Sequence, residues 1–370
     1  MTECAIRLLN LTKRFDGEQE PAVSALSLDV PRGRTVALIG PSGCGKTTTL
    51  RMINRLVEPT SGRIEIDGED ASARPVAELR RSIGYVIQEV GLFPHQTVSQ
   101  NIATVPRMLR WDRGRIDERV AELADLLGLE TEQLGRYPDE LSGGQQQRVG
   151  VARALAADPP VLLMDEPFGA VDPIVRTRLQ DELLALQERL RKTIVIVTHD
   201  IDEAVKVADN VALLNIGGKL EQYAAPDDLL HSPANAFVEQ FLGEDREMKR
   251  LALKRVGDLP FERGPVLDLG AAPAEARALL GDARSEWLGL TQDERFAGWV
   301  PRERVDTAAT LDALPRELPA AQVHPGSTLR EAMEVIMNSR TSVAVIDDGG
   351  RFGGVVTLEQ IRSELARRAS

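Results

Sequence analysis

Residues 35–48 read TVALIGPSGCGKTT, an apolar run that leads directly into a glycine-rich loop. The loop matches the pattern G-x-x-x-x-G-K-[ST], with a predicted buried strand before it and a predicted helix after it. The glycines let successive backbone N–H groups face a phosphate chain, and the helix start adds the positive end of its dipole. Lys46 is then expected at the β- and γ-phosphates, and Thr47 at Mg²⁺. The residues expected to contact the phosphates are Gly40, Pro41, Ser42, Gly43, Cys44, Gly45, Lys46, Thr47 and Thr48.

The residues around this loop predict an α/β domain with a mostly parallel sheet. VLLMD (161–165) and TIVIVTH (193–199) are two further apolar runs, separated by the amphipathic helical stretch 175–190. The opening segments alternate apolar and polar residues as strands do, and residues 89–157 are predicted as an inserted helical subdomain.

Two adjacent carboxylates, Asp165 and Glu166, end the second apolar run. On an extended strand they would point to opposite faces, so they are expected to differ in role. Asp165 is the better metal partner, and Glu166 the better base for polarising an attacking water. His199, at the end of the third run, is a candidate contact of the γ-phosphate, although a lone histidine there is more often structural.

A second glycine-rich turn, LSGGQQQR at 141–148, comes after a phosphate loop that is already complete. Ser142 and the backbone N–H groups of Gly143 and Gly144 begin a predicted helix, which makes a second anion site. The phosphate loop already serves the one nucleotide expected in this chain, so this second turn has no evident ligand of its own.

With these motifs, about residues 1–245 resemble the nucleotide-binding subunit of an ABC transporter. The resemblance implies an ABC-type P-loop NTPase fold, with a mostly parallel sheet, an antiparallel β subdomain and a helical subdomain, that binds ATP and Mg²⁺. It also implies a homodimer packed head to tail, in which the LSGGQ signature of one subunit caps the ATP of the other. The signature residues are Ser142, Gly143, Gly144 and Gln145.

Other family elements carry over onto single residues. Phe15 stands where an aromatic ring stacks on adenine, Gln88 is the Q-loop glutamine, and Asp172 is the aspartate at the dimer seam. His199 is the switch histidine. The resemblance therefore assigns catalysis to Glu166, His199 and Gln88, and Mg²⁺ binding to Thr47, Gln88 and Asp165.

The C-terminal third contains an internal repeat. A shift of 56 residues aligns RFAGWVPRERV (295–305) with RFGGVVTLEQI (351–361) without gaps. The predicted organisation is an ATPase domain over 1–243, a charged linker over 244–262, and repeats over 263–310 and 318–370. The pair resembles tandem CBS repeats of β-α-β-β-α form.

Adenosyl-binding CBS repeats commonly carry a Thr-x-x-Asp segment near the end. Here Gln360 replaces the acid in the second copy, and Arg304 stands at that place in the first. Binding of adenine nucleotides is therefore doubtful, and a dimerising module or a sensor of ionic strength are the alternatives.

Composition limits the possible partners. The net charge is −12 with no basic tract, which argues against nucleic acid. No window approaches a membrane span, the first residues lack a signal-peptide core, and two cysteines fit a reducing compartment. Cys44 lies beside a lysine and a helix start, both of which favour a thiolate.

The stretches IGYVIQEVGLFPHQTVSQNIA and SPANAFVEQFLG resemble the osmoprotectant importers most. That resemblance implies a peripheral subunit at the cytoplasmic face of the membrane, bound to a separate permease and served by an extracytoplasmic solute-binding protein. The expected cargo is glycine betaine, carnitine, choline or proline. An importer for methionine, a metal or another amine is the alternative within transport, and a soluble ABC protein for translation or DNA repair is the alternative outside it.

Overall fold

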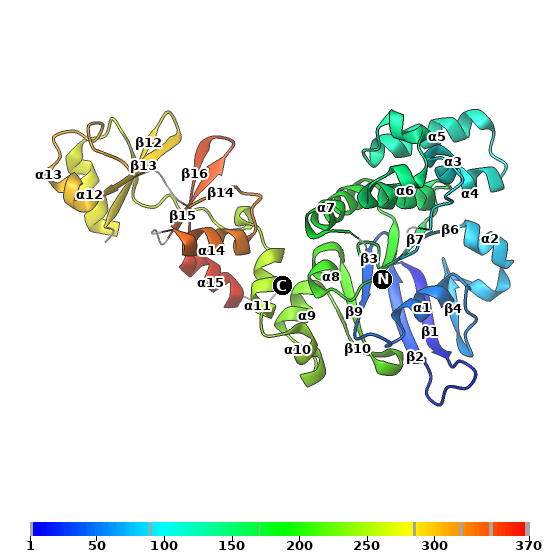
Figure 1. Ribbon diagram of the computed structural model, residues 1–370. Helices are drawn as coiled ribbons and strands as arrows, with labels where there is room; N and C mark the ends of the chain where they lie inside the picture. Colours follow the sequence, from blue (N-terminus) through cyan, green and yellow to red (C-terminus); the bar gives the residue numbers. More distant parts are fainter. Residues whose placement is uncertain are drawn as a thin grey trace. The chain divides into compact units, whose positions relative to one another are not determined.

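The apolar run before the glycine loop forms β3 (Thr35–Ile39), a strand buried along its whole length. The computed structural model describes residues 3–88, 91–169, 171–283, 286–317, 321–339 and 343–366. Its chain divides into two compact units, Met1–Gly243 and Glu244–Ser370. Figure 1 shows the elements in chain order.

The first unit is built on a mostly parallel sheet in the order β10-β9-β3-β8-β7-β6. Neighbouring pairs from β9 to β6 are parallel, and β10 adds antiparallel to β9. The remaining strands of this sheet are β6 (Ile83–Val86), β7 (Val161–Asp165), β8 (Thr193–Val197), β9 (Asn210–Asn215) and β10 (Lys219–Ala224). The predicted parallel α/β core is confirmed.

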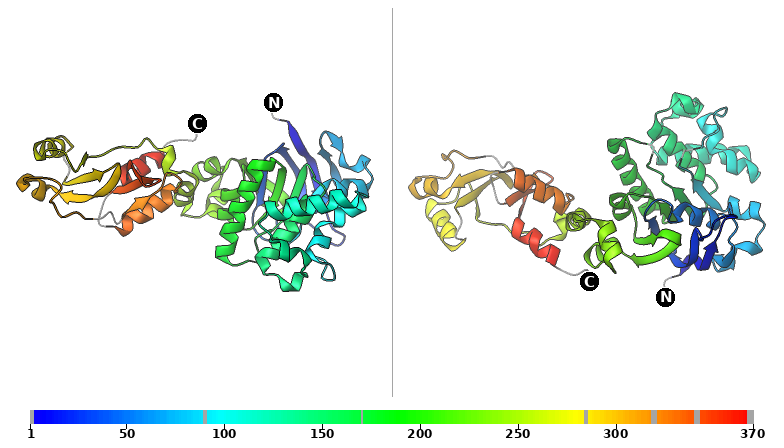
Figure 2. Two further views of the ribbon diagram at one scale, coloured as in Figure 1. Left: turned by 90° about the horizontal axis from the view of Figure 1, so that it is seen from above. Right: turned by 60° about the horizontal axis from the view of Figure 1, so that its bottom comes forward.

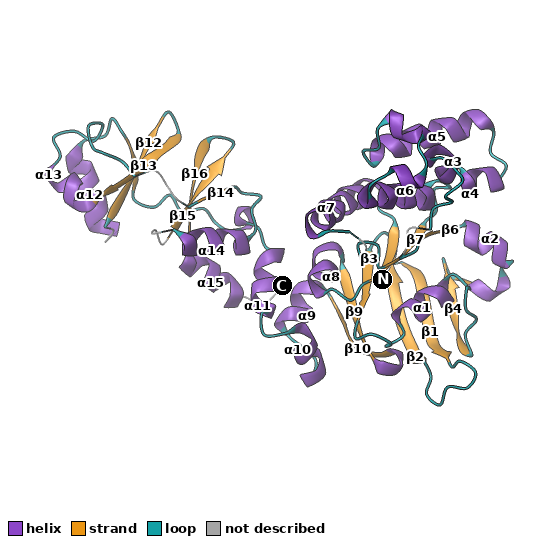
Figure 3. Cartoon of the chain, viewed as in Figure 1, coloured by secondary structure: helices purple, strands orange, loops and turns teal. Residues whose placement is uncertain are grey.

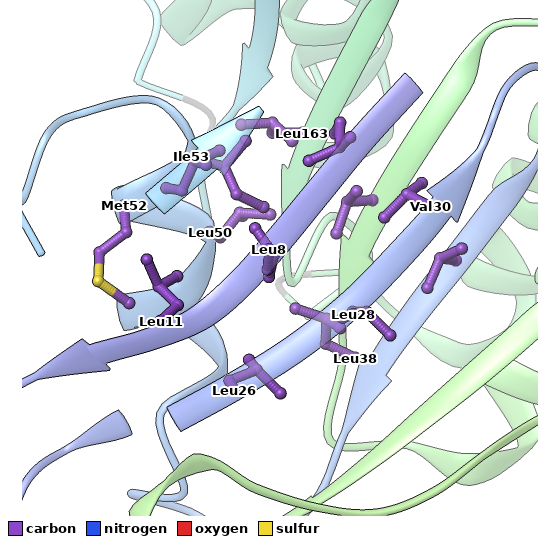
Figure 4. Close-up of a cluster of buried hydrophobic side chains, with 14 of the residues drawn as sticks. Leu8, Leu11, Leu26, Leu28, Val30, Leu38, Leu50, Met52, Ile53 and Leu163 are labelled. Carbon is purple, nitrogen blue, oxygen red and sulfur yellow. The ribbon is translucent and has the colours of Figure 1, made fainter. Parts of the chain in front are cut away.

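A second, antiparallel sheet in the order β2-β1-β4-β5 lies in the same unit, seen among the strands of Figure 3. Its strands are β1 (Cys4–Lys13), β2 (Val23–Pro31), β4 (Ser61–Ile66) and β5 (Glu69–Asp70). Alternate residues of β1 and β2 point into one apolar core, where Leu8 and Leu28 meet Leu50 of the first helix (Figure 4). The antiparallel sheet is thereby packed against the helix that follows the phosphate loop.

Helices complete the first unit. The sheet is accompanied by α1 (Lys46–Ile53), α2 (Val76–Arg81), α7 (Pro173–Leu190), α8 (Ile201–Val207), α9 (Pro226–His231) and α10 (Ala236–Leu242). The inserted segment holds α3 (Val98–Ile102), α4 (Thr104–Met108), α5 (Arg113–Leu126) and α6 (Gly143–Leu155). Helices therefore dominate the predicted helical subdomain, whose first two residues, 89 and 90, lie outside the described residues.

The second unit repeats one pattern. Strands β12 (Trp287–Gln292) and β13 (Arg295–Pro301) recur 56 residues later as β15 (Val343–Asp348) and β16 (Arg351–Thr357), with matching antiparallel register. Each hairpin gains a parallel strand from upstream, β11 (Val266–Asp268) or β14 (Gln322–Val323). The associated helices are α12 (Pro273–Ala283), α13 (Arg302–Thr307), α14 (Leu329–Asn338) and α15 (Leu358–Ala366). The hairpins therefore recur at the 56-residue spacing found in the sequence. Residues 318–320, 340–342 and 367–370 of the second copy lie outside the described residues.

The segment that precedes each copy pairs with a strand of the other copy. Glu262, before the first copy, pairs with Val355 of the second, while Glu317, before the second copy, pairs with Trp299 of the first. The aromatic rings of Phe296 and Phe352 lie 5.4 Å apart between the copies. Figure 2 shows the two hairpins side by side.

The expectation of a charged linker over 244–262 differs from the structure. Residues Arg246–Leu253 form α11, which packs on α14 and α15. Leu251 joins the apolar core of the second copy, and the fully buried Arg250 donates a 2.9 Å hydrogen bond to the carbonyl of Leu365. Because long basic side chains bury their apolar stems, a highly charged sequence here forms an integral helix.

Candidate functional site

The phosphate loop connects β3 to α1 and depends on glycine at two positions. Gly40 (φ 144°) would place a Cβ 2.1 Å from the carbonyl oxygen of Leu214, and Gly45 (φ 96°) would place one 2.4 Å from that of Ala22. No side chain fits at either position. The ammonium of Lys46 curls back over the loop and donates to the carbonyls of Gly40 (2.8 Å) and Pro41 (3.0 Å). The loop is thus already folded around the place where a phosphate chain would lie.

Asp165 lies at the end of β7, beside the phosphate loop. The Thr47 hydroxyl donates to Asp165 Oδ1 at 2.9 Å. Burial raises the pKa of Asp165, although this hydrogen bond and the charges of Arg51 and Lys46 oppose the rise. A buried carboxylate and a hydroxyl at this distance form a pair of oxygen ligands beside the phosphate loop, of the kind that a metal ion binds.

Glu166 lies between two predicted partners. Gln88 donates from Nε2 to Glu166 Oε2 at 2.9 Å, and His199 Nδ1 lies 3.3 Å from Glu166 Oε1. The three predicted catalytic side chains therefore come together in the structure. His199 remains 63% exposed, so its ring is open to a molecule that enters the site.

The backbone at Glu166 differs from the extended strand that was expected. Its φ of 45° is left-handed, and the chain turns there, with the N–H of Gly169 donating to the Glu166 carbonyl at 3.1 Å. A non-glycine residue in this region costs about 1–2 kcal/mol. Asp165 and Glu166 face different groups, as expected. The cause is the turn at Glu166, however, and not the alternation of side chains along a strand.

Sheet topology explains why these residues meet. Strands β3, β8, β7 and β6 lie side by side in this order and run parallel, so their carboxyl ends share one edge of the sheet. The phosphate loop follows β3, Asp165 ends β7, His199 follows β8 and Gln88 follows β6. Residues more than a hundred positions apart in sequence are brought to one place by this order.

The signature turn opens α6. The Ser142 hydroxyl accepts from the N–H of Gln145 at 3.4 Å, while Gln145 Oε1 accepts from the N–H of Ser142 at 2.8 Å, forming a capping box. Gln146 donates to the carbonyls of Pro138 and Leu141, which fixes the preceding loop. Gly144 would place a Cβ 2.8 Å from Val175. Among the described residues, no hydrogen bond or ion pair joins this turn to the phosphate loop of the same chain.

Asp172 has a local structural role. Its carboxylate accepts from the N–H groups of Ile174 and Val175, both at 3.1 Å, and so caps α7. Ile174 is almost fully exposed on the first turn of that helix. Ala170, in the same loop, lies outside the described residues, and the assignment of Asp172 to a dimer seam stays a prediction.

Phe15 follows β1 and is 41% exposed. The ammonium of Lys13 lies 5.1 Å from the centre of its ring. The ring is therefore available to a flat ligand, and stacking on adenine stays a prediction.

The expectation of a reactive thiolate at Cys44 is wrong. Burial raises the pKa of this thiol despite the Lys46 ammonium 3.8 Å away, because the side chain is 0% exposed. The sequence places Cys44 near positive charge, but the burial that outweighs this charge depends on the folded loop.

We expect the folded protein, in a Cys4→Ser background, to react with a maleimide at least about tenfold more slowly than the unfolded chain. A bulky adduct on Cys44 would displace Lys46, so each modified molecule should lose nucleotide hydrolysis. Mass spectrometry and turnover measured on the same samples test this. Rapid labelling of the folded protein, or full turnover after labelling, would contradict it.

Two residues near the site gave no sequence signal. Arg153 on α6 donates to the carbonyl of Gly91 at 2.7 Å and lies 5.7 Å from the ring of Phe93, so it connects the signature helix to the loop after Gln88. Glu203 on α8 is buried beneath the His199 loop. Both are ordinary charged residues of amphipathic helices in the sequence, and only tertiary packing gives them partners.

Two features are absent from the described residues. No group of three or more His, Cys, Asp or Glu side chains in the described ranges is placed to hold a metal ion. In the same part of the chain, no helix is long and apolar enough to cross a membrane.

Comparisons with known proteins agree with one another. Residues 23–169 match the family model described as ABC transporter. The osmoprotectant import ATP-binding protein OsmV of Salmonella typhimurium is 44% identical, over 98% of this chain and 96% of its own length. The glycine betaine/carnitine/choline transport ATP-binding protein OpuCA of Bacillus subtilis is 44% identical, over 95% of this chain and 94% of its own length. Among solved structures, a dimeric bacterial ABC transporter cassette is 35% identical with a TM-score of 0.54, covering 60% of this chain and 98% of that one.

Proposed function

The chain belongs to the ATP-binding subunits of ABC transporters, and we propose that it powers import of a compatible solute of the glycine betaine, carnitine, choline or proline class. The identity to relatives named for such solutes, 44% across nearly the whole chain, carries this proposal. That identity extends beyond the ATPase unit, because the alignments cover at least 95% of the chain.

The geometry fits hydrolysis of ATP by an activated water. With the phosphates in the loop between Gly40 and Thr47, the Glu166 carboxylate accepts a proton from the attacking water. Gln88 and His199 lie within hydrogen-bonding reach of Glu166 and orient its carboxylate. The exposed ring of His199 is the proposed contact of the terminal phosphate. Transfer of a phosphoryl group to water needs mainly such positioning and neutralisation of charge.

Mg²⁺ fits the donors present. Thr47 and Asp165 supply a hydroxyl and a carboxylate that already lie 2.9 Å apart. Mg²⁺ commonly uses one or two protein oxygens together with substrate phosphates, which agrees with a site that lacks a full cage of protein ligands. Gln88 is the third proposed ligand, although its hydrogen bond goes to Glu166. The ion would offset phosphate charge during hydrolysis.

The signature turn fits a partner's nucleotide. Ser142 and Gly143 are exposed at the start of a helix of 13 residues, whose dipole favours an anion. The similar solved cassette is a dimer. We therefore assign Ser142, Gly143, Gly144 and Gln145 to the ATP of a second copy, and Asp172 to the seam between copies.

A permease is the expected membrane partner. Three apolar side chains between Gln88 and the signature turn are exposed. Phe93 lies in the loop after β6, Met108 ends α4, and Leu109 follows Met108. Exposed apolar residues of this kind suit a protein partner. The proposed place of work is the cytoplasmic face of the membrane, with solute delivered by an extracytoplasmic binding protein.

The second unit fits a tandem CBS pair with copies over 263–310 and 318–370. The residues that replace the usual acid hold upstream segments instead. Gln360 donates to the carbonyl of Pro260 at 3.2 Å, and Arg304 donates to that of Pro315 at 3.3 Å. Because these side chains serve the pairing of the copies, we favour a regulatory or dimerising module over one that binds adenine nucleotides.

Reconstitution in vesicles, with the permease and binding protein encoded beside this chain's gene, tests both the solute class and the role of the second unit. We expect ATP-driven uptake of glycine betaine or choline at least about tenfold above that of methionine. A chain ending at Gly243 should keep uptake, because all proposed ATP-site residues precede that point, while the dependence on internal ionic strength should flatten. Preferred uptake of methionine or a metal would overturn the solute class. An unchanged ionic response would leave the second unit as a dimerising element.

A further inference from the structure

A buried carboxylate lies directly beneath the His199 loop. Glu203 on α8 is 5% exposed. It accepts hydrogen bonds from the Thr198 hydroxyl and, at 3.4 Å, from Nε2 of Gln180. Neither residue is part of the hydrolytic group described above.

Thr198 connects this carboxylate to both sides of His199. Its hydroxyl donates to Glu203 and accepts from the N–H of Asp200 at 3.0 Å. Its own N–H donates to the carbonyl of Leu38 at 3.2 Å. The two residues that flank His199 are therefore fixed through one hydroxyl, whose orientation depends on Glu203.

Gln180 extends the chain of hydrogen bonds to α7, the helix capped by Asp172. A second contact joins the same helix to the loop, since Arg176 Nη1 lies 3.6 Å from Asp200 Oδ2. Movement of α7 relative to β8 would thus act directly on the His199 backbone.

If this position served packing alone, a carboxylate would cost more free energy to bury than an apolar side chain. Burying it disfavours the charged form, and burial raises the pKa of Glu203 against the opposing hydrogen bonds from Thr198 and Gln180. An apolar residue would pack α8 against α7 without this cost, but it could not hold the Thr198 hydroxyl.

We propose that Glu203 is a positioning residue for hydrolysis: with Thr198 and Gln180 it holds the loop so that His199 reaches Glu166, and it connects that loop to α7. This inference rests on the proposed ATPase function. It assigns Glu203 no contact with ATP.

Steady-state ATPase kinetics of the full chain, assembled with its permease, test the proposal. Glu203→Leu and Thr198→Val should each lower kcat on the order of tenfold and leave KM for ATP within about twofold, because the nucleotide contacts remain. Glu203→Gln, which can still accept from Thr198, should restore most of kcat. Lys206→Met is the matched control, because it removes the 2.7 Å ion pair with Asp181 between the same two helices. It should keep the wild-type kcat.

A double-mutant cycle with His199→Ala separates positioning from stability. If Glu203 acts through His199, Thr198→Val should lower turnover by less than about twofold in the His199→Ala background, followed over hours with radiolabelled ATP. Equal losses in both backgrounds, or an unchanged kcat in Glu203→Leu and Thr198→Val, would overturn the inference. A wild-type chain without ATPase activity would instead overturn the proposed function.

Discussion

Glu166→Gln should bind ATP normally and hydrolyse it about 10²–10⁴-fold more slowly. The amide keeps the size of the carboxylate and can still bond Gln88, but it cannot accept a proton from water. The phosphate contacts proposed for Lys46 and Thr47 do not involve Glu166, so affinity should stay within about threefold of the wild type. With hydrolysis blocked, ATP should hold two chains together, and size-exclusion chromatography should show a stable dimer.

Glu188→Gln is the matched control for the Glu166 prediction, because it makes the same change in charge on an exposed part of α7. It should hydrolyse ATP at the wild-type rate. Thermal unfolding should place both variants within about 0.5 kcal/mol of the wild type. If Glu166→Gln keeps more than a tenth of the turnover, Glu166 is not the base.

Ser142→Asp should nearly abolish hydrolysis without weakening nucleotide binding by the single chain. Aspartate caps a helix about as well as serine, so α6 should still form. Its charge would, however, face the phosphate of the second copy, at a cost of about 4 kcal/mol for unit charges about 4 Å apart at an effective dielectric of 20. Combined with Glu166→Gln, it should remove the ATP-dependent dimer.

Ser142→Asn differs from Ser142→Asp in charge alone and also caps well. It should keep the ATP-dependent dimer in the Glu166→Gln background and much of the turnover in the native one. Equal behaviour of the two variants, with both forming the dimer, would contradict a phosphate of the partner at this turn.

Much of the fold could be predicted because its strongest signals are local. The run TVALIG and the glycines after it define a strand and a loop through short-range sterics, and the 56-residue repeat is visible in the sequence itself. Helix α11 could not be predicted in this way. Its apolar residues are few, and the burial of Arg250 depends on a carbonyl 115 positions away.

The candidate site likewise has features that the local sequence predicts and features that depend on tertiary packing. Lys46, Thr47, Asp165, Glu166 and His199 could be placed because each ends or follows a buried strand, and parallel strands deliver their ends to one edge. The left-handed turn at Glu166, the raised pKa of Cys44 and the partners of Glu203 depend on packing between distant segments. No window of sequence contains the groups that cause them.

The exchange of segments between the two C-terminal copies has a thermodynamic consequence. Glu262, just before the first copy, pairs with the second copy, and Glu317, just before the second copy, pairs with the first, so each hairpin is paired with the segment that leads into the other. Because each copy loses a pairing when the other unfolds, the pair should unfold in one cooperative transition. A destabilising substitution in the first copy should then lower the stability of the second copy as well. The first copy is therefore needed for folding even without a ligand of its own.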